Sequence, residues 1–296
     1  MPAGDVERVE LRVMGVRAHV EVHGAPRRTA GLGATRLADL EARWSRFRPD
    51  SEISRLRVAG GEWLAVSVET VELVSVAVEA WRATGGACDP TVAPALEALG
   101  YDRTFAALPA DGPVGAPVPA PGCAGIEIGA DRVRFPRGVG FDPGAIGKGL
   151  AGDVVCRELL ALGACGVVVC VGGDVVVAGA PVHGGPWGID VASPDGGAPL
   201  ARLGIGSGAV ATSAPGARSG HHVVDPATGR PVGAGPRSAT VVAGAGWWAE
   251  AWATALTVVG PLLLDRLPAA HALLVDATGA VHVTPGLHGH VLRGAA

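Results

Sequence analysis

The stretch FDPGAIGKGLAGD, residues 141–153, joins a glycine-rich loop to an apolar helical pattern. One acidic residue precedes a short run of glycine and lysine, namely Asp142, Gly144, Gly147, Lys148 and Gly149. Lys148 is the only lysine in the chain, and all other permanent cations are arginines. Glycines let the backbone approach a ligand closely, and the start of a helix favours anions. The stretch therefore predicts a loop for an anionic group, with a compact ammonium rather than a planar guanidinium.

Other interpretations of this stretch stay open from the residues alone. A phosphate-binding P-loop needs GxxxxGK[ST], but Asp142 and Gly149 replace its first glycine and its hydroxyl residue. No GxGxxG follows a strand, so a dinucleotide-binding fingerprint is also missing. The structural alternative is a tight strand-to-helix turn in which Asp142 caps the helix. The helix is expected to end at Gly163 and to bury Leu150, Val154, Cys156, Leu159 and Leu160.

Composition and charge exclude several classes of protein. With 296 residues, of which 48% are hydrophobic, the chain can bury a sizeable core. A net charge of −4 without any basic block gives no electrostatic basis for nucleic-acid binding. No apolar run reaches about 18 residues, so we expect no transmembrane segment, and the N-terminal residues do not resemble a signal peptide. The five cysteines lack metal-binding spacing, which favours reduced thiols and a cytoplasmic location.

The intermixed helix and strand patterns favour an α+β fold, with mixed or antiparallel sheets packed against helices. Residues 8–23 alternate apolar and polar and turn near Gly15, and residues 166–179 read as two buried strands broken by a glycine pair. A helix is expected to carry four apolar residues on one face and to stop at Pro49: Leu37, Leu40, Trp44 and Phe47.

Later segments complete this picture. Ser51 and Ser67 are expected to cap further helices, and residues 247–260 form a helical pattern of about three turns. Strands are expected near 187–191 and 210–213, and the C-terminal part reads as a hairpin. We expect one domain over residues 1–296, with a flexible excursion rich in alanine, proline and glycine at about 107–123.

Polar residues in three other places are candidates for chemistry. Glu250 and Thr254 lie four residues apart on one helix, and a carboxylate beside a hydroxyl suits a hard cation such as Mg²⁺. A solvated helix face is the ordinary alternative. His222 is a candidate general base, although an exposed loop histidine is equally in keeping with its polar surroundings. Asp225 opens a DPATG turn, and Asp89 either caps a helix or contacts a ligand.

The order of these segments resembles the ApbE family of flavin transferases over nearly the whole chain. Six segments carry the likeness: SRFRPDSEISRLR (45–57), GACDPTVAP (86–94), FDPGAIGKGLAGD (141–153), VGGDVVVAG (171–179), ATSAPGARSGHHVVDPATGRPV (211–232) and AEAWATALTVVG (249–260). Each is similar to a motif of that family. The chain departs from the family pattern at several positions, and Glu250 stands where the family usually has aspartate.

The resemblance implies an ApbE-like fold and a Mg²⁺-dependent reaction. In that reaction the FMN part of FAD moves to a threonine of an acceptor flavoprotein, and AMP is released. It also implies Mg²⁺ ligands at the Ala145 carbonyl, Glu250 and Thr254, and a candidate base at His222 with Asp225 nearby. The FAD-binding residues it implies are Met14, Phe47, Ala87, Cys88, Asp89, Asp142, Gly144, Gly147, Lys148, Thr212 and Ser213. Two alternatives remain, a hydrolase that splits FAD into FMN and AMP, and a non-catalytic FAD-binding maturation protein.

Overall fold

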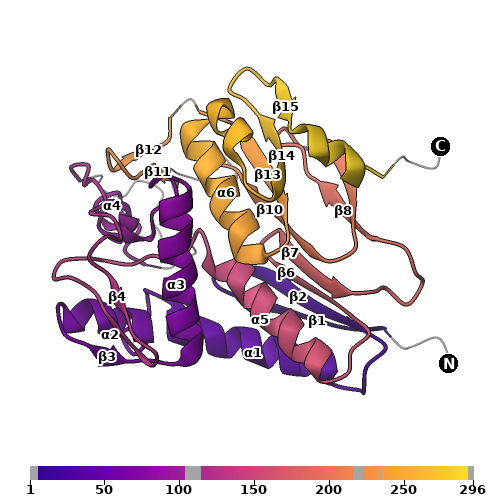
Figure 1. Ribbon diagram of the computed structural model, residues 1–296, viewed down its shortest axis with the longest axis horizontal. Coiled ribbons are helices and arrows are strands. Elements are labelled where there is room, and N and C mark those ends of the chain that lie inside the picture. The colour runs from indigo at the N-terminus through magenta and orange to yellow at the C-terminus, as the bar shows by residue number, and fades with distance from the viewer. Residues whose placement is uncertain (1–5, 104–114, 216–222, 234, 293–296) are drawn as a thin grey trace.

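The computed structural model describes residues 6–103, 115–215, 223–233 and 235–292. Its centre is an eight-stranded sheet in the order β1-β2-β6-β7-β10-β13-β14-β15, and every neighbouring pair is antiparallel (Figure 1). The strands are β1 (Val6–Val13), β2 (Val16–His23), β6 (Gly166–Val171), β7 (Asp174–Gly179), β10 (Gly208–Ser213), β13 (Ser238–Ala243), β14 (Ala270–Val275) and β15 (Val281–Val283). The predicted α+β class is confirmed.

Helices cover one face of this sheet, and a second small sheet covers part of the other. The helices are α1 (Thr29–Trp44), α2 (Glu52–Ala59), α3 (Val68–Ala83), α4 (Ala93–Ala98), α5 (Gly147–Ala161) and α6 (Gly246–Val259). Helices α1, α5 and α6 contact the sheet directly, and α3 packs beside them (Figure 1). On the opposite face, β8 (Trp187–Val191) and β9 (Ala201–Ile205) enclose a second apolar cluster with β7, β10, β13 and β14.

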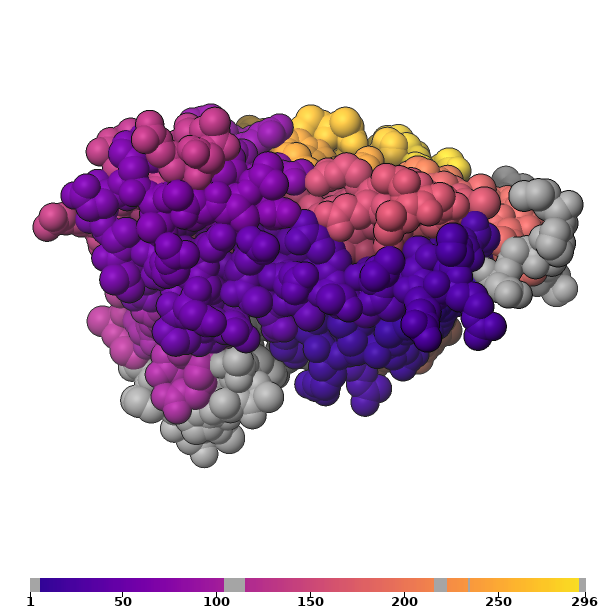
Figure 2. Space-filling model, turned by 90° about the horizontal axis from the view of Figure 1, so that it is seen from below, coloured from indigo at the N-terminus to yellow at the C-terminus, as the bar shows by residue number. Residues whose placement is uncertain are grey.

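Short elements join these layers. A three-stranded sheet is formed by β3 (Leu64–Ala65), β5 (Arg132–Arg134) and β4 (Glu127–Ile128), and a two-stranded one by β11 (Val224–Asp225) and β12 (Arg230–Pro231). Short 3₁₀ helices in the described part of the chain are η1 (Pro90–Val92), η3 (Pro261–Arg266) and η4 (Pro285–His290). Figure 2 views the molecule from below, where the N-terminal third of the chain forms most of the visible surface.

The hairpins form where the sequence indicates turns. Met14 and Gly15 connect β1 to β2 with φ angles of 53° and 73°, the left-handed pair that suits a two-residue hairpin. Gly172 and Gly173 do the same between β6 and β7, with φ angles of 64° and 101°. Both expected pairs of strands are therefore confirmed, and both turns reach the same cleft, described below.

Helix α1 ends earlier than its apolar pattern predicts. Leu37, Leu40 and Trp44 are buried on its inner face, but Phe47 lies beyond the helix and is 38% exposed. The hydroxyl of Ser45 accepts a hydrogen bond from the Phe47 N–H, and Ser45 itself is extended. A serine that bonds to nearby backbone in this way competes with helix continuation. The expected helical position of Phe47 was wrong for that reason.

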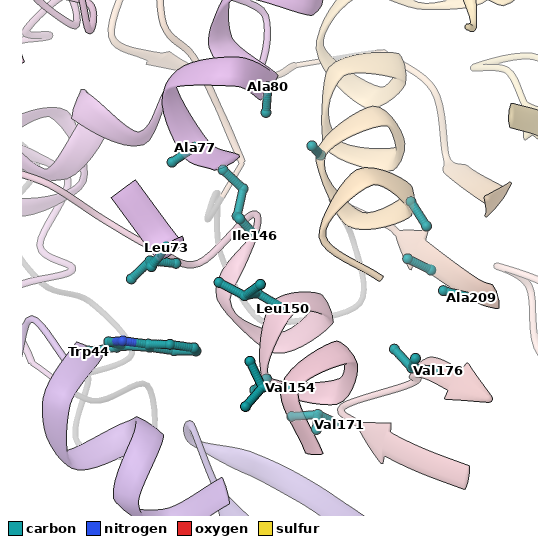
Figure 3. Packing of buried hydrophobic residues seen from close by; sticks show 14 of the residues in the cluster. Trp44, Leu73, Ala77, Ala80, Ile146, Leu150, Val154, Val171, Val176 and Ala209 are labelled. Atoms are coloured by element: carbon teal, nitrogen blue, oxygen red, sulfur yellow. The ribbon is translucent and has the colours of Figure 1, made fainter. Parts of the chain in front are cut away.

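The main core lies between the helices and the sheet. Figure 3 shows Trp44 of α1, Leu73 of α3 and Leu150 of α5 pointing toward one another, and all three are almost completely buried. The Trp44 indole N–H donates to the Thr70 hydroxyl at 3.2 Å, so this buried ring has no unpaired polar group. The expected caps are also present, because Ser51 accepts from Ser54 N and Ser67 accepts from Thr70 N.

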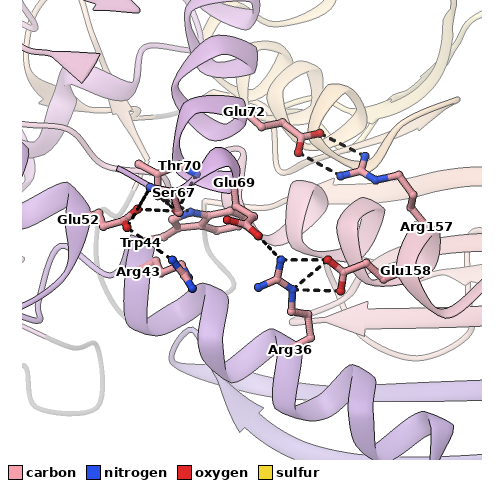
Figure 4. A network of polar contacts seen from close by, with 10 residues as sticks. All are labelled: Arg36, Arg43, Trp44, Glu52, Ser67, Glu69, Thr70, Glu72, Arg157 and Glu158. Atoms are coloured by element: carbon pink, nitrogen blue, oxygen red, sulfur yellow. Dashed lines mark hydrogen bonds and ion pairs between the residues drawn. The ribbon is translucent and has the colours of Figure 1, made fainter. Parts of the chain in front are cut away.

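Ion pairs tie the helices together at their outer surface. Arg36 of α1 bridges Glu69 of α3 and Glu158 of α5, and Arg157 of α5 pairs with Glu72 of α3 (Figure 4). Arg36 is mostly buried, whereas the Arg157 pair is exposed, so we expect the second to contribute little to stability.

Helices α5 and α6 meet at their N-termini, where glycine faces glycine. A Cβ added to Gly149 would lie 2.6 Å from the Trp247 nitrogen and would overlap the Gly246 carbonyl group. A Cβ added to Gly246 would overlap the Gly149 carbonyl oxygen in turn. Both positions thus require glycine for close approach of backbone to backbone. The helix predicted from Leu150 onward is confirmed as α5, with residue 149 in its first turn.

Two predicted features stay only partly described. Residues 107–114 of the expected excursion lie outside the described residues. The remainder is bonded to the rest of the protein, with Ala120 N donating to Pro226 O and Gly122 N donating to the Thr91 hydroxyl. Its flexibility and the single-domain assignment stay predictions. Among the described helices, none is both long enough and apolar enough to span a bilayer.

Replacing Gly149 by alanine should destabilise the protein, because the added methyl group overlaps the backbone of α6. Overpacking of this kind typically costs about 1–3 kcal/mol. Gly31, in α1, is the matched control, because a Cβ there meets nothing within 4 Å and alanine is the better helix former. Urea denaturation of both variants checks this. Equal stabilities for Gly149→Ala and Gly31→Ala would contradict the close crossing.

Candidate active site

One cleft of about 940 Å³ lies where α5 and α6 begin, between the sheet and the ends of α1 and α4. This volume is within the range of small-molecule sites. The cleft brings together residues that are far apart in sequence. Of the residues predicted for the site, those that line it are Met14, Phe47, Ala87, Asp89, Asp142, Gly144, Ala145, Gly147, Lys148, Thr212, Ser213, Glu250 and Thr254.

Lys148 lies at the centre of a buried charge cluster on the cleft wall. Its ammonium forms ion pairs with Glu250 and with Asp174, the latter at 3.2 Å, and donates to the Gly144 carbonyl oxygen at 3.1 Å. Glu250 uses its other oxygen to accept the Gly149 N–H at 2.8 Å. Its carboxylate therefore reaches from α6 to the first turn of α5. Asp174 in turn accepts the Thr212 N–H at 3.1 Å.

Burial and charge act against each other in this cluster. Burial disfavours the ammonium of Lys148, but the carboxylates of Glu250 and Asp174 more than offset it and raise the pKa of Lys148. Burial also raises the pKa of Glu250, and Asp174 adds to that effect, whereas Lys148 and the Gly149 N–H oppose it. We therefore expect Lys148 to remain charged across the physiological range.

Asp142 is held by two partners and does not cap α5. Its carboxylate forms an ion pair with the Arg46 guanidinium at 2.6 Å and accepts the Gly144 N–H at 2.6 Å. The residue that precedes α5 is Ile146, which makes no side-chain capping bond. The structural alternative of an Asp142 cap is therefore wrong. The bond to Gly144 instead shapes the loop, and Arg46 stacks over the Phe47 ring with its guanidinium carbon 4.2 Å from the ring centre.

The 87–89 turn contributes two residues to the cleft and one to the core. The Asp89 carboxylate accepts the Thr91 N–H at 2.7 Å and the Thr91 hydroxyl at 2.6 Å, so it caps η1 as well as lining the cleft. Burial raises the pKa of Asp89 against the effect of these bonds. Cys88 is completely buried behind this turn, outside the cleft lining, and burial raises the pKa of its thiol.

Other predicted residues are fixed by bonds along the cleft. The Met14 N–H donates to the Glu41 carboxylate at 2.7 Å, which holds the β1–β2 turn against α1. The hydroxyls of Thr212 and Ser213 bond to Thr240 at 2.9 Å and Thr257 at 3.2 Å. These contacts hold both hydroxyls of β10 against the neighbouring strand β13 and helix α6.

Of the two candidate bases, only Asp225 lies within the described residues. His222 lies outside the described residues. Asp225 lies in β11, and its carboxylate accepts the Ala227 N–H at 3.0 Å and the Thr228 hydroxyl at 2.9 Å. Its neighbours Val224 and Pro226 line the cleft, but Asp225 itself is not among the lining residues. The role of either residue as a base stays a prediction.

The side chains at the cleft wall have the oxygen chemistry that Mg²⁺ prefers. Glu250 supplies a carboxylate, Thr254 a hydroxyl and Ala145 a backbone carbonyl, all hard oxygen donors, and each residue lines the cleft. The described residues contain no cluster of three or more histidine, cysteine, aspartate or glutamate side chains able to hold a metal. Mg²⁺ does not need such a cluster, because it commonly takes one or two carboxylates and completes its shell with water and substrate phosphates.

Two residues that bond directly to predicted site residues, Asp174 and Arg46, were not themselves predicted for the site. Asp174 belongs to a GGD turn, where an acidic residue after two glycines could have been taken as a signal. Arg46 precedes Phe47 and bonds to Asp142 and to the Tyr101 carbonyl oxygen at 2.6 Å. Nothing in the local sequence distinguishes it from the neighbouring arginines, since its role depends on contacts across the fold.

Asp153 of α5 fixes the start of α6. Its carboxylate accepts the Gly246 N–H at 2.8 Å and the Trp247 N–H at 3.2 Å. Glu250 of α6 caps α5 in return through Gly149. Each helix therefore satisfies free N–H groups of the other, groups that have no partner within their own helix. This exchange holds Glu250 at the cleft.

Comparison with known proteins gives this architecture a class. Over 98% of this chain and all of the other, the fold matches the crystal structure of the ApbE protein from Thermotoga maritima, with a TM-score of 0.85 and 26% identity. A protein named FAD:protein FMN transferase from Vibrio cholerae serotype O1 is 30% identical over 76% of this chain and 71% of its own length. The same name is carried by a Salmonella typhimurium protein that is 28% identical over 88% of this chain and 79% of its own. The Vibrio and Salmonella relatives are thus named as transferases.

The sequence model of the ApbE family matches residues 14–273, and the chain belongs to the ApbE family. The resemblance inferred from its six motifs is thereby confirmed. The matched range begins at the β1–β2 turn, ends in β14, and includes every residue predicted for the site.

The stability that Asp153 contributes should depend on pH. Burial raises the pKa of this carboxyl from 3.8 to about 6, although the Gly246 and Trp247 N–H groups oppose the shift. Since the folded state then holds the proton more tightly than the unfolded state, this contribution is complete below pH 3.8 and is lost as the pH rises through 6. The advantage of wild type over Asp153→Asn should therefore shrink by roughly 3 kcal/mol across this window. Urea denaturation of both proteins from pH 4 upward measures it, and a pH-independent difference would contradict the shift.

Proposed function

We propose that this protein transfers the FMN part of FAD to a threonine hydroxyl of an acceptor flavoprotein and releases AMP. The observation that carries the proposal is a cleft that gathers thirteen predicted residues from five separate motifs and the β1–β2 turn. The names of the relatives support flavin transfer to protein as the reaction class. The acceptor threonine and AMP as product are our additions, in keeping with the chemistry of the cleft.

The cleft suits a dinucleotide with a charged middle. Phe47, with Arg46 stacked on it, offers a flat surface at one wall, and aromatic rings of this kind stack on planar heterocycles. The loop of residues 142–148 leads into the N-terminus of α5, where the helix dipole favours phosphate. We place the FAD pyrophosphate at this loop and the two ring systems along the walls on either side of it.

The proposed step is an in-line displacement at the phosphorus of the FMN half. The threonine oxygen forms a new P–O bond, and the bond from that phosphorus to the bridging oxygen of the pyrophosphate breaks. The bridging oxygen leaves with AMP, and the threonine proton passes to a base. Phosphoryl transfer depends mainly on positioning and charge stabilisation, so this chain acts by holding the pyrophosphate in place.

We assign Glu250, Thr254 and the Ala145 carbonyl as the residues that would hold Mg²⁺. When bound, the ion supplies positive charge that stabilises the charge developing on the phosphate oxygens. Glu250 is positioned for this by its bond to Gly149, which fixes one carboxylate oxygen and leaves lone pairs on the other.

The proton acceptor is assigned to His222 or Asp225. Asp225 holds the DPATG turn through two hydrogen bonds, and its neighbours Val224 and Pro226 line the cleft.

We keep the cytoplasm as the proposed compartment. All five cysteines lie within the described residues, and each is a free thiol.

Incubation with FAD, Mg²⁺ and candidate acceptor proteins, followed by intact mass spectrometry, tests the proposed reaction. We expect an FMN-sized mass gain on the acceptor together with one AMP for each flavin transferred, and no product when EDTA removes the metal. AMP and free FMN without any adduct would instead show a hydrolase. Bound FAD without AMP would show a non-catalytic binding protein, and either of these results would contradict the proposal.

Substitution of His222 by alanine should slow transfer by roughly 10²–10⁴-fold, the usual contribution of a general base. FAD affinity should stay near the wild-type value, because a base acts on the incoming hydroxyl. Asp225→Asn is the comparison, since the amide keeps an oxygen acceptor for the turn while removing the basic carboxylate. Single-turnover rates and FAD titration by flavin fluorescence separate the two. If only Asp225→Asn is slow, the base is Asp225.

A further inference from the structure

The ammonium of Lys148 lies in a cage of protein oxygens. Its three contacts are the Gly144 carbonyl at 3.1 Å, the Asp174 carboxylate at 3.2 Å and the Glu250 carboxylate. A lysine ammonium has three N–H donors, so these contacts account for all of them. Lys148 lines the FAD-sized cleft but is fully engaged by the protein itself.

The cage has the composition of a cation site. The side chains of Asp174 and Glu250 are only 6% and 5% exposed, and burying two carboxylates is costly unless positive charge neutralises them. One ammonium balances one of the two. Their other oxygens are bonded to the Thr212 and Gly149 N–H groups, which fixes the carboxylates in place and points the remaining charge at Lys148.

The same Glu250 carboxylate is the one we assign to Mg²⁺, so a cation of the protein already occupies a position that the metal would use. A lysine is suited to such an exchange. Its ammonium is a point charge on a flexible four-carbon stem, whereas an arginine would be held by a planar, two-pronged contact. Lys148 is the only lysine in a chain whose other basic residues are all arginine.

We propose that Lys148 is the internal counter-ion of the metal site, and that its ammonium and Mg²⁺ compete for the Glu250 carboxylate. In the metal-free protein the ammonium balances one of the two carboxylates and links α5 to α6 through Glu250. When Mg²⁺ takes the Glu250 carboxylate, the N–H group that Glu250 accepted becomes available to an oxygen of the FAD pyrophosphate, while the contacts to Gly144 and Asp174 remain. This inference rests on the Mg²⁺ assignment under the proposed function.

The test is a Mg²⁺ titration by isothermal calorimetry without FAD, so its readout is independent of activity. Lys148→Met removes the competing ammonium and should lower the Kd for Mg²⁺ by about tenfold or more. The reason is that Mg²⁺ no longer has to break the Lys148–Glu250 ion pair in order to bind. Lys148→Arg keeps a competing cation in a firmer, two-pronged contact and should bind Mg²⁺ no more tightly than wild type. Arg157→Met removes a cation from an exposed site on the same helix and controls for a general loss of positive charge.

A second pair of variants keeps the test decisive if Lys148→Met folds poorly, because that change leaves two buried carboxylates unpaired. Asp174→Asn with Lys148→Met has the net cage charge of wild type, and it should bind Mg²⁺ about tenfold more tightly than Asp174→Asn alone. Equal or weaker binding on loss of Lys148, in a protein that does bind Mg²⁺, overturns the competition and leaves the metal assignment standing. Absence of Mg²⁺ binding from wild type and all variants also overturns the competition, and the EDTA control of the transfer assay then decides the metal assignment.

Discussion

Two helix N-termini meet at Gly149 and Gly246, where neither residue has room for a side chain. Such a meeting places two positive helix ends and several free N–H groups against each other. The chain resolves this by exchanging carboxylates, with Asp153 of α5 on α6 and Glu250 of α6 on α5. Each carboxyl group satisfies N–H groups that the close contact leaves without a helical partner, and the contact brings each group within reach of them.

The chemistry of the cleft follows from this constraint. Asp153 anchors the first turn of α6. This fixes the positions of Glu250 and Thr254 on the cleft wall, which the loop beginning at Asp142 also lines. The excess negative charge of Glu250 and Asp174 then requires a cation, which Lys148 supplies from α5. Asp142 is kept out of this cluster by Arg46 and serves instead to shape the loop. Glu250 and Lys148 thus have two roles: they bond α5 to α6, and they are the groups proposed to bind the metal and the phosphate.

Local sequence patterns predicted most of the helices and strands but few of the side-chain contacts between them. The hairpin at Gly15, the strands around Gly172 and the helix after residue 147 all follow from short-range periodicity and turn residues. The strand β13 was missed because serine, alanine and threonine occupy four of its six buried positions and weaken the apolar signal. Phe47 was placed on a helix that Ser45 ends. The six motifs indicated which residues gather, yet the Lys148–Asp174 and Arg46–Asp142 pairs depend on folding and are invisible in sequence spacing.

A crystal structure of the protein with FAD and Mg²⁺ tests most directly the claim that the helix meeting point is the pyrophosphate site. The account predicts that the pyrophosphate lies at the start of α5, between the loop of residues 142–148 and α6, with Glu250 and Thr254 on the metal. It also predicts that the Lys148 ammonium contacts phosphate oxygen rather than Glu250. A pyrophosphate bound elsewhere in the cleft, with the Lys148–Glu250 ion pair intact, would contradict it.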